Sequence, residues 1–308
     1  MPNFIENDIV CKDSKKLTEF IKPETVDITI TSPPYRNAID YAKHANGINQ
    51  SENKYYRASK EWNTEKYLKT MRKIFDEVYD VTKPGGFCCI VIGYELHDRE
   101  IIPLPSLLLT TLLRKDKQNR NWKLREEIIW NKVTAGRKGA GNRFGVTIKN
   151  PYPKYYYTNI MHEYIFVLSK GDKIPHNLTE DTLKKANKLP MNEIMYKEVA
   201  NSFWNITPVP PSAIPHPCPY PEQIPWRLIL LYTYPNDLVL DPFNGSGQTT
   251  KVAKILGRRY IGVDTEQKYV NLAKERIKKE KLGLTKNILV QKHEKIEWKD
   301  ELEKYGFK

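Results

Sequence analysis

The sequence predicts an α/β protein built on a doubly wound, mostly parallel β-sheet. Apolar runs with little polar alternation recur along the chain, as expected for strands that are buried on both faces. Stretches with helical apolar spacing separate these runs, and the alternation of strands and helices is typical of this fold class. Two of the strands also run directly into tight loops of distinctive composition, which carry most of the chemical signal.

The expected elements follow the chain in that alternating order. Strands are expected at 26–31, 86–92, 127–130, 161–168, 237–241 and 259–264. Helices are expected at 64–82, 223–233, 248–257 and 266–280. The length of 308 residues suits one large domain with insertions, or two modest domains, and we expect a single domain over residues 1–308.

Three less regular segments interrupt this pattern. They are residues 36–62, 131–158 and 171–215, whose charged, Asn-, Gly- and Pro-rich composition predicts insertions that face a partner. The Lys/Glu-rich end at 279–308 is expected to be a solvated helix or strand edge. The chain carries 50 Lys and Arg against 37 Asp and Glu, and the resulting net charge of +13 favours a polyanionic partner.

The cysteines and the hydropathy pattern narrow the class of protein. Cys88 and Cys89 lie in an apolar run where buried, reduced thiols are expected, and the spacing of the four cysteines indicates neither a zinc site nor a disulfide framework. The apolar run from Ile101 to Leu113 contains two prolines and is too short to span a bilayer. No apolar segment follows the N-terminus, so we expect a cytoplasmic protein.

The later of the two loops, at residues 241–250, has the composition of a nucleoside-cofactor site. Asp241, at the tip of its strand, can accept a hydrogen bond from an ammonium group, and the glycines of the loop let the backbone approach a ligand closely. Thr249 opens a helix whose first N–H groups have no partner within the helix. Asp264, nineteen residues after Gly245, ends the next strand and can bind ribose hydroxyls.

This arrangement suits the amino-acid end of S-adenosylmethionine. The loop does not read Gly-x-Gly-x-x-Gly, so a methyl donor is favoured over NAD. An ordinary strand–turn–helix with a capping Asp or Thr is the alternative interpretation. We expect both acids, Asp241 and Asp264, to lie at the mouth of the loop and not in the core.

The earlier loop, Thr31-Ser32-Pro33-Pro34-Tyr35, has the composition of a site that activates an amine. An exocyclic amino group on a nucleobase gives its lone pair to the ring, so it is a poor nucleophile until hydrogen-bond acceptors pull it toward tetrahedral geometry. Ser32 Oγ and the Pro33 carbonyl can be those acceptors, held by two prolines that restrict the backbone. Tyr35 offers a ring on which an extruded base can stack. The alternative is a Pro-Pro turn after a buried strand.

Both loops resemble the signature motifs of the exocyclic-amino DNA methyltransferases, which use S-adenosylmethionine. Further stretches are similar to recurrent segments of that family, namely Lys83–Phe87, Trp130–Lys132, His162–Phe166, His216–Glu222 and Gly257–Asp264. The motif order, with the catalytic loop first, is that of the circularly permuted group called beta. The resemblance implies a Rossmann-like methyltransferase fold and a cofactor site formed by Asp13, Thr31, Pro217, Asp241, Pro242, Phe243, Gly245, Ser246, Gly247, Thr249 and Asp264.

In this family a serine before Pro-Pro-Tyr points to N4 of cytosine as the methyl acceptor, whereas aspartate mostly accompanies N6 of adenine. The resemblance therefore implies site-specific methylation of cytosine N4 in double-stranded DNA, by base flipping and direct in-line transfer. It also implies a restriction–modification system with a cognate restriction endonuclease. Adenine-N6 methylation, an RNA methyltransferase and a non-catalytic DNA-binding relative remain alternatives. The Pro217-Cys218 pair suggests a further alternative, because a Pro-Cys pair carries the nucleophile of the cytosine-C5 methyltransferases. In that class the pair follows the glycine loop, whereas here it precedes the loop, so we interpret Cys218 as a packing residue.

Basic residues interleaved with tyrosines are the candidates for DNA contact, because this mixture suits phosphates and base faces. A solvated loop with a tyrosine-rich edge is the alternative interpretation. The family's target-recognition region would fall at about residues 171–205. The candidates are Arg137, Lys138, Arg143 and Lys149, together with Arg36 and His44 just after the catalytic loop.

Overall fold

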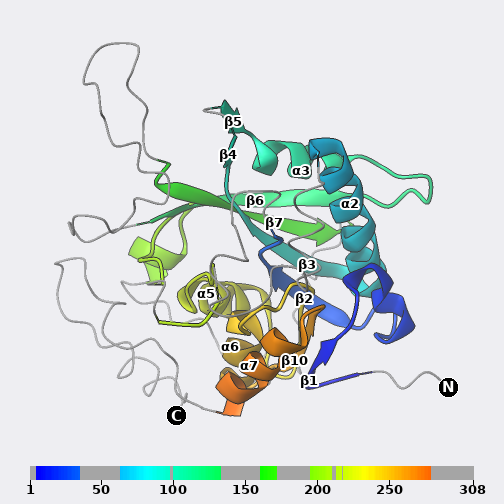
Figure 1. The fold of residues 1–308 in the computed structure, drawn as a ribbon, viewed down its shortest axis with the longest axis vertical. Helices are drawn as coiled ribbons and strands as arrows, with labels where there is room; N and C mark the ends of the chain where they lie inside the picture. The colour runs from blue at the N-terminus through cyan, green and yellow to red at the C-terminus, as the bar shows by residue number, and fades with distance from the viewer. Residues whose placement is uncertain are drawn as a thin grey trace.

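The structure is a computed structural model that describes residues 5–34, 63–97, 100–132, 160–171, 195–209, 213–216 and 218–278. The described residues form a sheet of eight strands with helices on both faces (Figure 1). The strand order in this sheet is β1-β10-β9-β2-β3-β7-β6-β8. A small hairpin of β4 (Glu95–His97) and β5 (Glu100–Ile102) lies outside it.

Strand pairing in the large sheet is parallel except at β7, which runs antiparallel to both β3 and β6. The bounds are β1 (Asp8–Cys11), β2 (Val26–Thr31), β3 (Thr82–Ile92), β6 (Trp122–Asn131), β7 (His162–Lys170), β8 (Phe203–Asn205), β9 (Leu238–Asp241) and β10 (Arg259–Asp264). The mostly parallel sheet with helices on both faces confirms the predicted fold class.

Helices cover the two faces of the sheet in two groups (Figure 1). The bounds are η1 (Ser14–Glu19), α2 (Thr64–Val81), α3 (Leu104–Leu113), α5 (Gln223–Tyr232), α6 (Gln248–Ile255) and α7 (Gln267–Lys278). One group is η1, α2 and α3, and the other is α5, α6 and α7. Successive side chains of β3 point to opposite faces of the sheet. Cys88 packs in the core beneath α2, and Cys89 packs in the core beneath α5. The strands therefore read as continuous apolar runs, and both thiols are buried as expected.

All six expected strands and all four expected helices are present. The largest differences are at the starts of β3 and β6, which begin at Thr82 and Trp122, ahead of the expected residues 86 and 127. The first half of β6 is largely exposed and polar, so hydropathy alone did not separate it from a loop. It is a strand because it pairs with β7 along its whole length.

The sequence does not predict α3, β1 or β8. Helix α3 begins at Leu104, with Pro103 and Pro105 at its start, where proline removes no hydrogen bond that the helix needs. Strand β8 falls within 171–215, and its Trp204 is fully buried, so these three residues of that segment belong to the sheet. Among the described residues, no helix is both long and apolar enough to cross a membrane.

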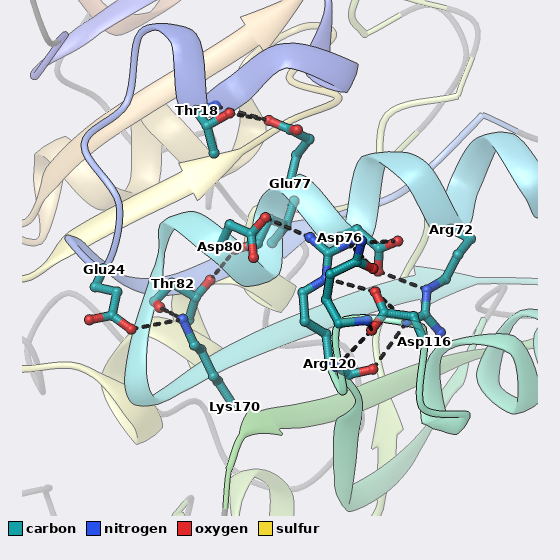
Figure 2. Close-up of polar contacts among 12 residues, drawn as sticks. Thr18, Glu24, Arg72, Asp76, Glu77, Asp80, Thr82, Asp116, Arg120 and Lys170 are labelled. Atoms are coloured by element: carbon teal, nitrogen blue, oxygen red, sulfur yellow. Dashed lines mark hydrogen bonds and ion pairs between the residues drawn. The ribbon is translucent and has the colours of Figure 1, made fainter.

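A cluster of ion pairs holds α2 at the edge of the sheet where β3 and β6 begin (Figure 2). Arg72 donates to Asp76 at 2.7 Å and to backbone carbonyls at the end of α3. Arg120, which precedes β6, pairs with Asp80 at 2.6 Å and with Asp116 at 2.7 Å. The cations of this cluster are paired with acids, which is the arrangement of a structural element. The two loops of chemical interest lie at the opposite edge.

Candidate active site

The strands β2, β9 and β10 are parallel neighbours and end at the same edge of the sheet, at Thr31, Asp241 and Asp264. The catalytic loop, residues 32–35, follows β2, and the glycine loop, residues 242–247, follows β9. Thr31 Oγ1 donates a hydrogen bond to Asp241 Oδ1 at 2.7 Å, across 210 residues of sequence. The sheet therefore joins the two loops into one site.

Asp241 lies at the centre of this site and is only 1% exposed. Its Oδ1 also accepts the N–H of Phe243 at 3.1 Å, and its Oδ2 accepts the hydroxyl of Tyr220 at 3.1 Å. Burial raises the pKa of this carboxyl to about 6. The expectation that Asp241 lies at an open loop mouth is wrong, because the carboxyl is buried against Thr31, Tyr220 and the backbone of Phe243. A direct contact between Asp241 and the cofactor stays a prediction.

Asp264, at the end of β10, is also buried, which corrects the same expectation. Its Oδ2 accepts the N–H of Gly245 at 2.8 Å, and its Oδ1 accepts the N–H of Glu266 at 2.9 Å. Burial raises the pKa of Asp264 to about 6. The carboxylate therefore holds the glycine loop against β10, and each oxygen keeps a lone pair for a further donor.

The two glycines of the loop are required by the backbone and by their neighbours. Gly245 and Gly247 have φ angles of +46° and +78°, a region that side chains disfavour. A Cβ on Gly245 would lie 2.7 Å from His216 Nε2, and one on Gly247 would lie 2.8 Å from the Cβ of Ala273. Any other residue would push the loop away from these neighbours. The close approach of this backbone to a ligand stays a prediction.

The remaining residues of the predicted cofactor site have diverse surroundings. Thr249 is fully buried and donates to the carbonyl of Ile30 at 3.0 Å, so it fastens α6 to β2 from the core side. Phe243 packs against Phe75 with ring centroids 6.4 Å apart. The carbonyl of Pro242 accepts a hydrogen bond from a buried serine of η1. These contacts give the loop a rigid base.

His216 and Tyr220 lie against the glycine loop and the start of α6, within the segment His216–Glu222 that resembles a family segment; of this segment the sequence predicts only Pro217 as a cofactor-site residue. His216 lies against Gly245, and its Nδ1 accepts the N–H of Cys218 at 3.3 Å. Burial lowers the pKa of His216 to about 4, so its ring is neutral near pH 7. The hydroxyl of Tyr220 contacts both Asp241 and Thr249. The available sequence signal was the clustering of His216 and Tyr220 with three prolines.

The catalytic loop begins at the surface of the same edge. Ser32 and Pro34 are partly buried, and Pro33 is buried. Asp13, which caps η1, accepts the N–H of Lys15 at 2.9 Å and forms an ion pair with the Lys15 ammonium at 3.2 Å. The other predicted site residues lie outside the described residues, namely Tyr35, Arg36, His44, Arg137, Lys138, Arg143, Lys149 and Pro217.

The described residues fit S-adenosylmethionine. Two buried carboxyls at neighbouring strand ends suit a ligand that carries positive charge. The turn at Gly245 and Gly247 has no room for side chains, and the first turn of α6 presents backbone N–H groups that suit a carboxylate.

The comparisons with known proteins show the family of the chain. A family model described as DNA methylase, for the N6 and N4 methyltransferases, matches residues 26–275. The type II methyltransferase M.SmaI of Serratia marcescens is 27% identical over 300 residues, which cover 87% of this chain and 90% of that protein. The type II methyltransferase M.MjaI of Methanocaldococcus jannaschii is 26% identical over 310 residues, covering 91% and 94%.

Solved structures share the fold. A DNA modification methylase of Thermus thermophilus, in complex with S-adenosylmethionine, superposes with a TM-score of 0.62 at 22% identity, covering 90% of this chain and 95% of that one. The cytosine-N4-specific PvuII DNA methyltransferase superposes with a TM-score of 0.60 at 16% identity, covering 98% and 92%. The chain belongs to the N6/N4 DNA methylase family and is a DNA methyltransferase that uses S-adenosylmethionine.

We expect the affinity for S-adenosylmethionine to fall as the pH is lowered from about 7.5 to about 5.5. Asp241 and Asp264 have pKa values raised from 3.8 to about 6, so they become protonated in this range and lose the charge that favours a cationic ligand. Calorimetric titration across the range measures the effect. Asp264→Asn should bind more weakly at pH 7.5 and show a shallower dependence.

The stability of the ligand-free protein should not follow the same trend. A carboxyl whose pKa is raised on folding stabilises the fold below its unfolded pKa, and this contribution is lost as the pH rises through about 6. These two groups therefore do not destabilise the fold as the pH falls from 7.5 to 5.5. An affinity that stays constant over the range, or that falls only in step with the melting temperature, would contradict the prediction.

Proposed function

We propose that the chain transfers the methyl group of S-adenosylmethionine to N4 of cytosine in a specific sequence of double-stranded DNA. The hydrogen bond from Thr31 to Asp241 carries the proposal, because it places the serine of Ser32-Pro33-Pro34 beside the cofactor loop. The serine in this motif supports cytosine over adenine. We also propose that the whole chain is one catalytic domain, with DNA-facing segments at 36–62, at 131–158 and in the part of 171–215 that lies outside β8.

The chain's own residues prepare the acceptor amine. Ser32 Oγ and the Pro33 carbonyl accept hydrogen bonds from the two amino protons, which draws the nitrogen lone pair out of the ring. Neither proline has an N–H that could compete for the carbonyls. The base reaches this loop after leaving the duplex stack, and Tyr35 stacks on it. The bound cofactor supplies an electrophilic methyl group on a sulfonium, so positioning of the amine accounts for most of the rate.

The relatives suggest the biological role. M.SmaI and M.MjaI are type II methyltransferases, and we infer that this chain is likewise the protective enzyme of a restriction–modification system. Its counterpart would be a restriction endonuclease that cleaves the same DNA sequence when it is unmethylated. The two enzymes share a target, and no physical contact between them is needed.

Methylome sequencing of DNA from cells that express the chain tests the proposal directly. It reports the modified base, its position and the sequence context together. Hydrolysis of the same DNA to nucleosides, followed by mass spectrometry, should yield N4-methylcytosine. N6-methyladenine would replace the cytosine assignment, modified RNA with unmodified DNA would overturn the substrate class, and no methylation despite cofactor binding would indicate a non-catalytic relative.

Replacing Arg137, Lys138 and Arg143 together by alanine should weaken binding to cognate and unrelated DNA alike. Each lost phosphate contact lowers the slope of log affinity against log salt by about 0.9. Affinity for S-adenosylmethionine should stay unchanged, because the cofactor loop is formed by other segments of the chain. A salt titration with both DNAs measures this. Loss of cognate binding alone would identify base-reading residues, and unchanged binding would exclude these three from the DNA surface.

A further inference from the structure

A buried acid shared by two cations lies beneath the glycine loop. This acid is Glu222, the residue directly before α5. Its Oε1 accepts hydrogen bonds from Lys251 Nζ of α6 at 2.9 Å and from Arg276 Nη2 of α7 at 2.8 Å. The side chains of Glu222 and Lys251 are each 7% exposed, and that of Arg276 is 15% exposed. Ion pairs so far from solvent hold their partners in fixed positions.

The two cations differ in what else they contact. Arg276 Nη1 donates to the carbonyl of Ser246 in the glycine loop at 2.5 Å. Its Nη2 also donates to Gln248 Oε1 at 2.5 Å, and Gln248 Nε2 in turn donates to the carbonyl of Tyr220 at 2.6 Å. The guanidinium thus joins the glycine loop, the start of α6 and the segment His216–Glu222. The Lys251 ammonium donates to Glu222.

The contact with Ser246 determines how the loop is oriented. The peptide unit between Ser246 and Gly247 is hydrogen-bonded at both ends. Its carbonyl accepts a hydrogen bond from Arg276, and its N–H donates to the carbonyl of Asn244 at 2.7 Å. Because a peptide unit is planar, a partner at each end fixes its rotation. This peptide leads directly into α6, so its rotation aims the first N–H groups of the helix.

We propose that Arg276 is a positioning residue for the cofactor: it fixes the peptide that leads into α6 and, through Glu222 and Gln248, holds the segment His216–Glu222 against the loop. Its planar fork suits three acceptors at once, whereas a lysine ammonium presents a single point of charge. The inference rests on cofactor use alone and is independent of which base is methylated.

The shared acid supplies a matched control. In Arg276→Met, Glu222 keeps Lys251 as its partner, and in Lys251→Met it keeps Arg276, so neither variant leaves the buried acid without a cation. Both variants remove one positive charge from the same carboxylate. Only Arg276→Met releases Ser246 and Gln248. If Arg276 only balances the charge of Glu222, the two variants should lose the same cofactor affinity. If Arg276 positions the loop, Arg276→Met should lose more affinity than Lys251→Met.

Binding of S-adenosylhomocysteine, measured by calorimetry without DNA, tests the proposal on the full chain. We expect Arg276→Met to weaken binding about tenfold or more, the effect of losing charge-assisted hydrogen bonds, with Lys251→Met close to wild type. Arg276→Lys keeps the charge and should still bind weakly. In turnover assays, Arg276→Met should raise KM for S-adenosylmethionine more than it lowers kcat.

Melting temperatures separate this role from general stability. Calorimetry at a temperature well below the melting temperature of both methionine variants ensures that a difference in affinity does not reflect unfolding. Equal loss of affinity in the two variants would overturn the proposal, as would wild-type affinity in Arg276→Met or full recovery in Arg276→Lys. A wild-type chain that binds the cofactor but methylates adenine would change the proposed function and leave this inference intact.

Discussion

Ser32→Ala is expected to lower methyl-transfer turnover by about a hundredfold or more, because one positioned catalytic hydrogen bond is worth about 3 kcal/mol. The amine would keep only the Pro33 carbonyl as acceptor and would stay closer to planar. Binding of S-adenosylmethionine should be unchanged, since Asp241 and Asp264 hold the glycine loop through the N–H groups of Phe243 and Gly245, without Ser32. Single-turnover assays with saturating cofactor and DNA measure the loss.

Thr25→Ala is the matched control for this variant. Thr25 precedes the same strand at the opposite edge of the sheet, and its hydroxyl donates to the carbonyl of Lys22 at 2.7 Å. The Thr25→Ala substitution removes one hydroxyl beside β2 without changing the catalytic loop, so turnover should stay near wild type. Wild-type turnover in Ser32→Ala would exclude the acceptor role, and weakened cofactor binding would make Ser32 a binding residue instead.

Asp241→Ala is expected to abolish measurable binding of S-adenosylmethionine and to lower the melting temperature. Three donors would lose this acceptor, namely the buried hydroxyls of Thr31 and Tyr220 and the part-buried N–H of Phe243. An unsatisfied buried donor costs about 1–3 kcal/mol, so the loop and the end of β2 should rearrange together. Calorimetry and thermal unfolding measure the two effects.

Asp241→Asn separates the charge of this group from its hydrogen bonds. The amide has nearly the same shape and keeps one acceptor oxygen, so Asp241→Asn should melt close to wild type. If the negative charge of Asp241 is what binds the cofactor, Asp241→Asn should still bind S-adenosylmethionine more weakly than wild type. Asp241→Ala with wild-type affinity and an unchanged melting temperature would contradict the role that the buried hydrogen bonds indicate.

The fold and the two loops were predictable because their signals are local. A buried parallel strand such as β2 reads as a continuous apolar run, and the prolines and glycines that follow β2 and β9 restrict the backbone whatever the surroundings. The short β8 was not predictable. Its three residues form a strand only because β6 lies beside them, and that pairing spans more than 70 residues of sequence.

Some features of the site were likewise predictable from the sequence, and others depended on tertiary structure. The sequence by itself determined the composition and order of both loops, and the resemblance of these loops to a known family implied the methyltransferase chemistry, because both signals come from consecutive residues. Only the tertiary structure decided that Asp241 and Asp264 are buried, that Thr31 binds Asp241, and that Arg276 shares Glu222 with a second cation. Burial and such contacts depend on which elements become neighbours, and packing sets that across the whole chain.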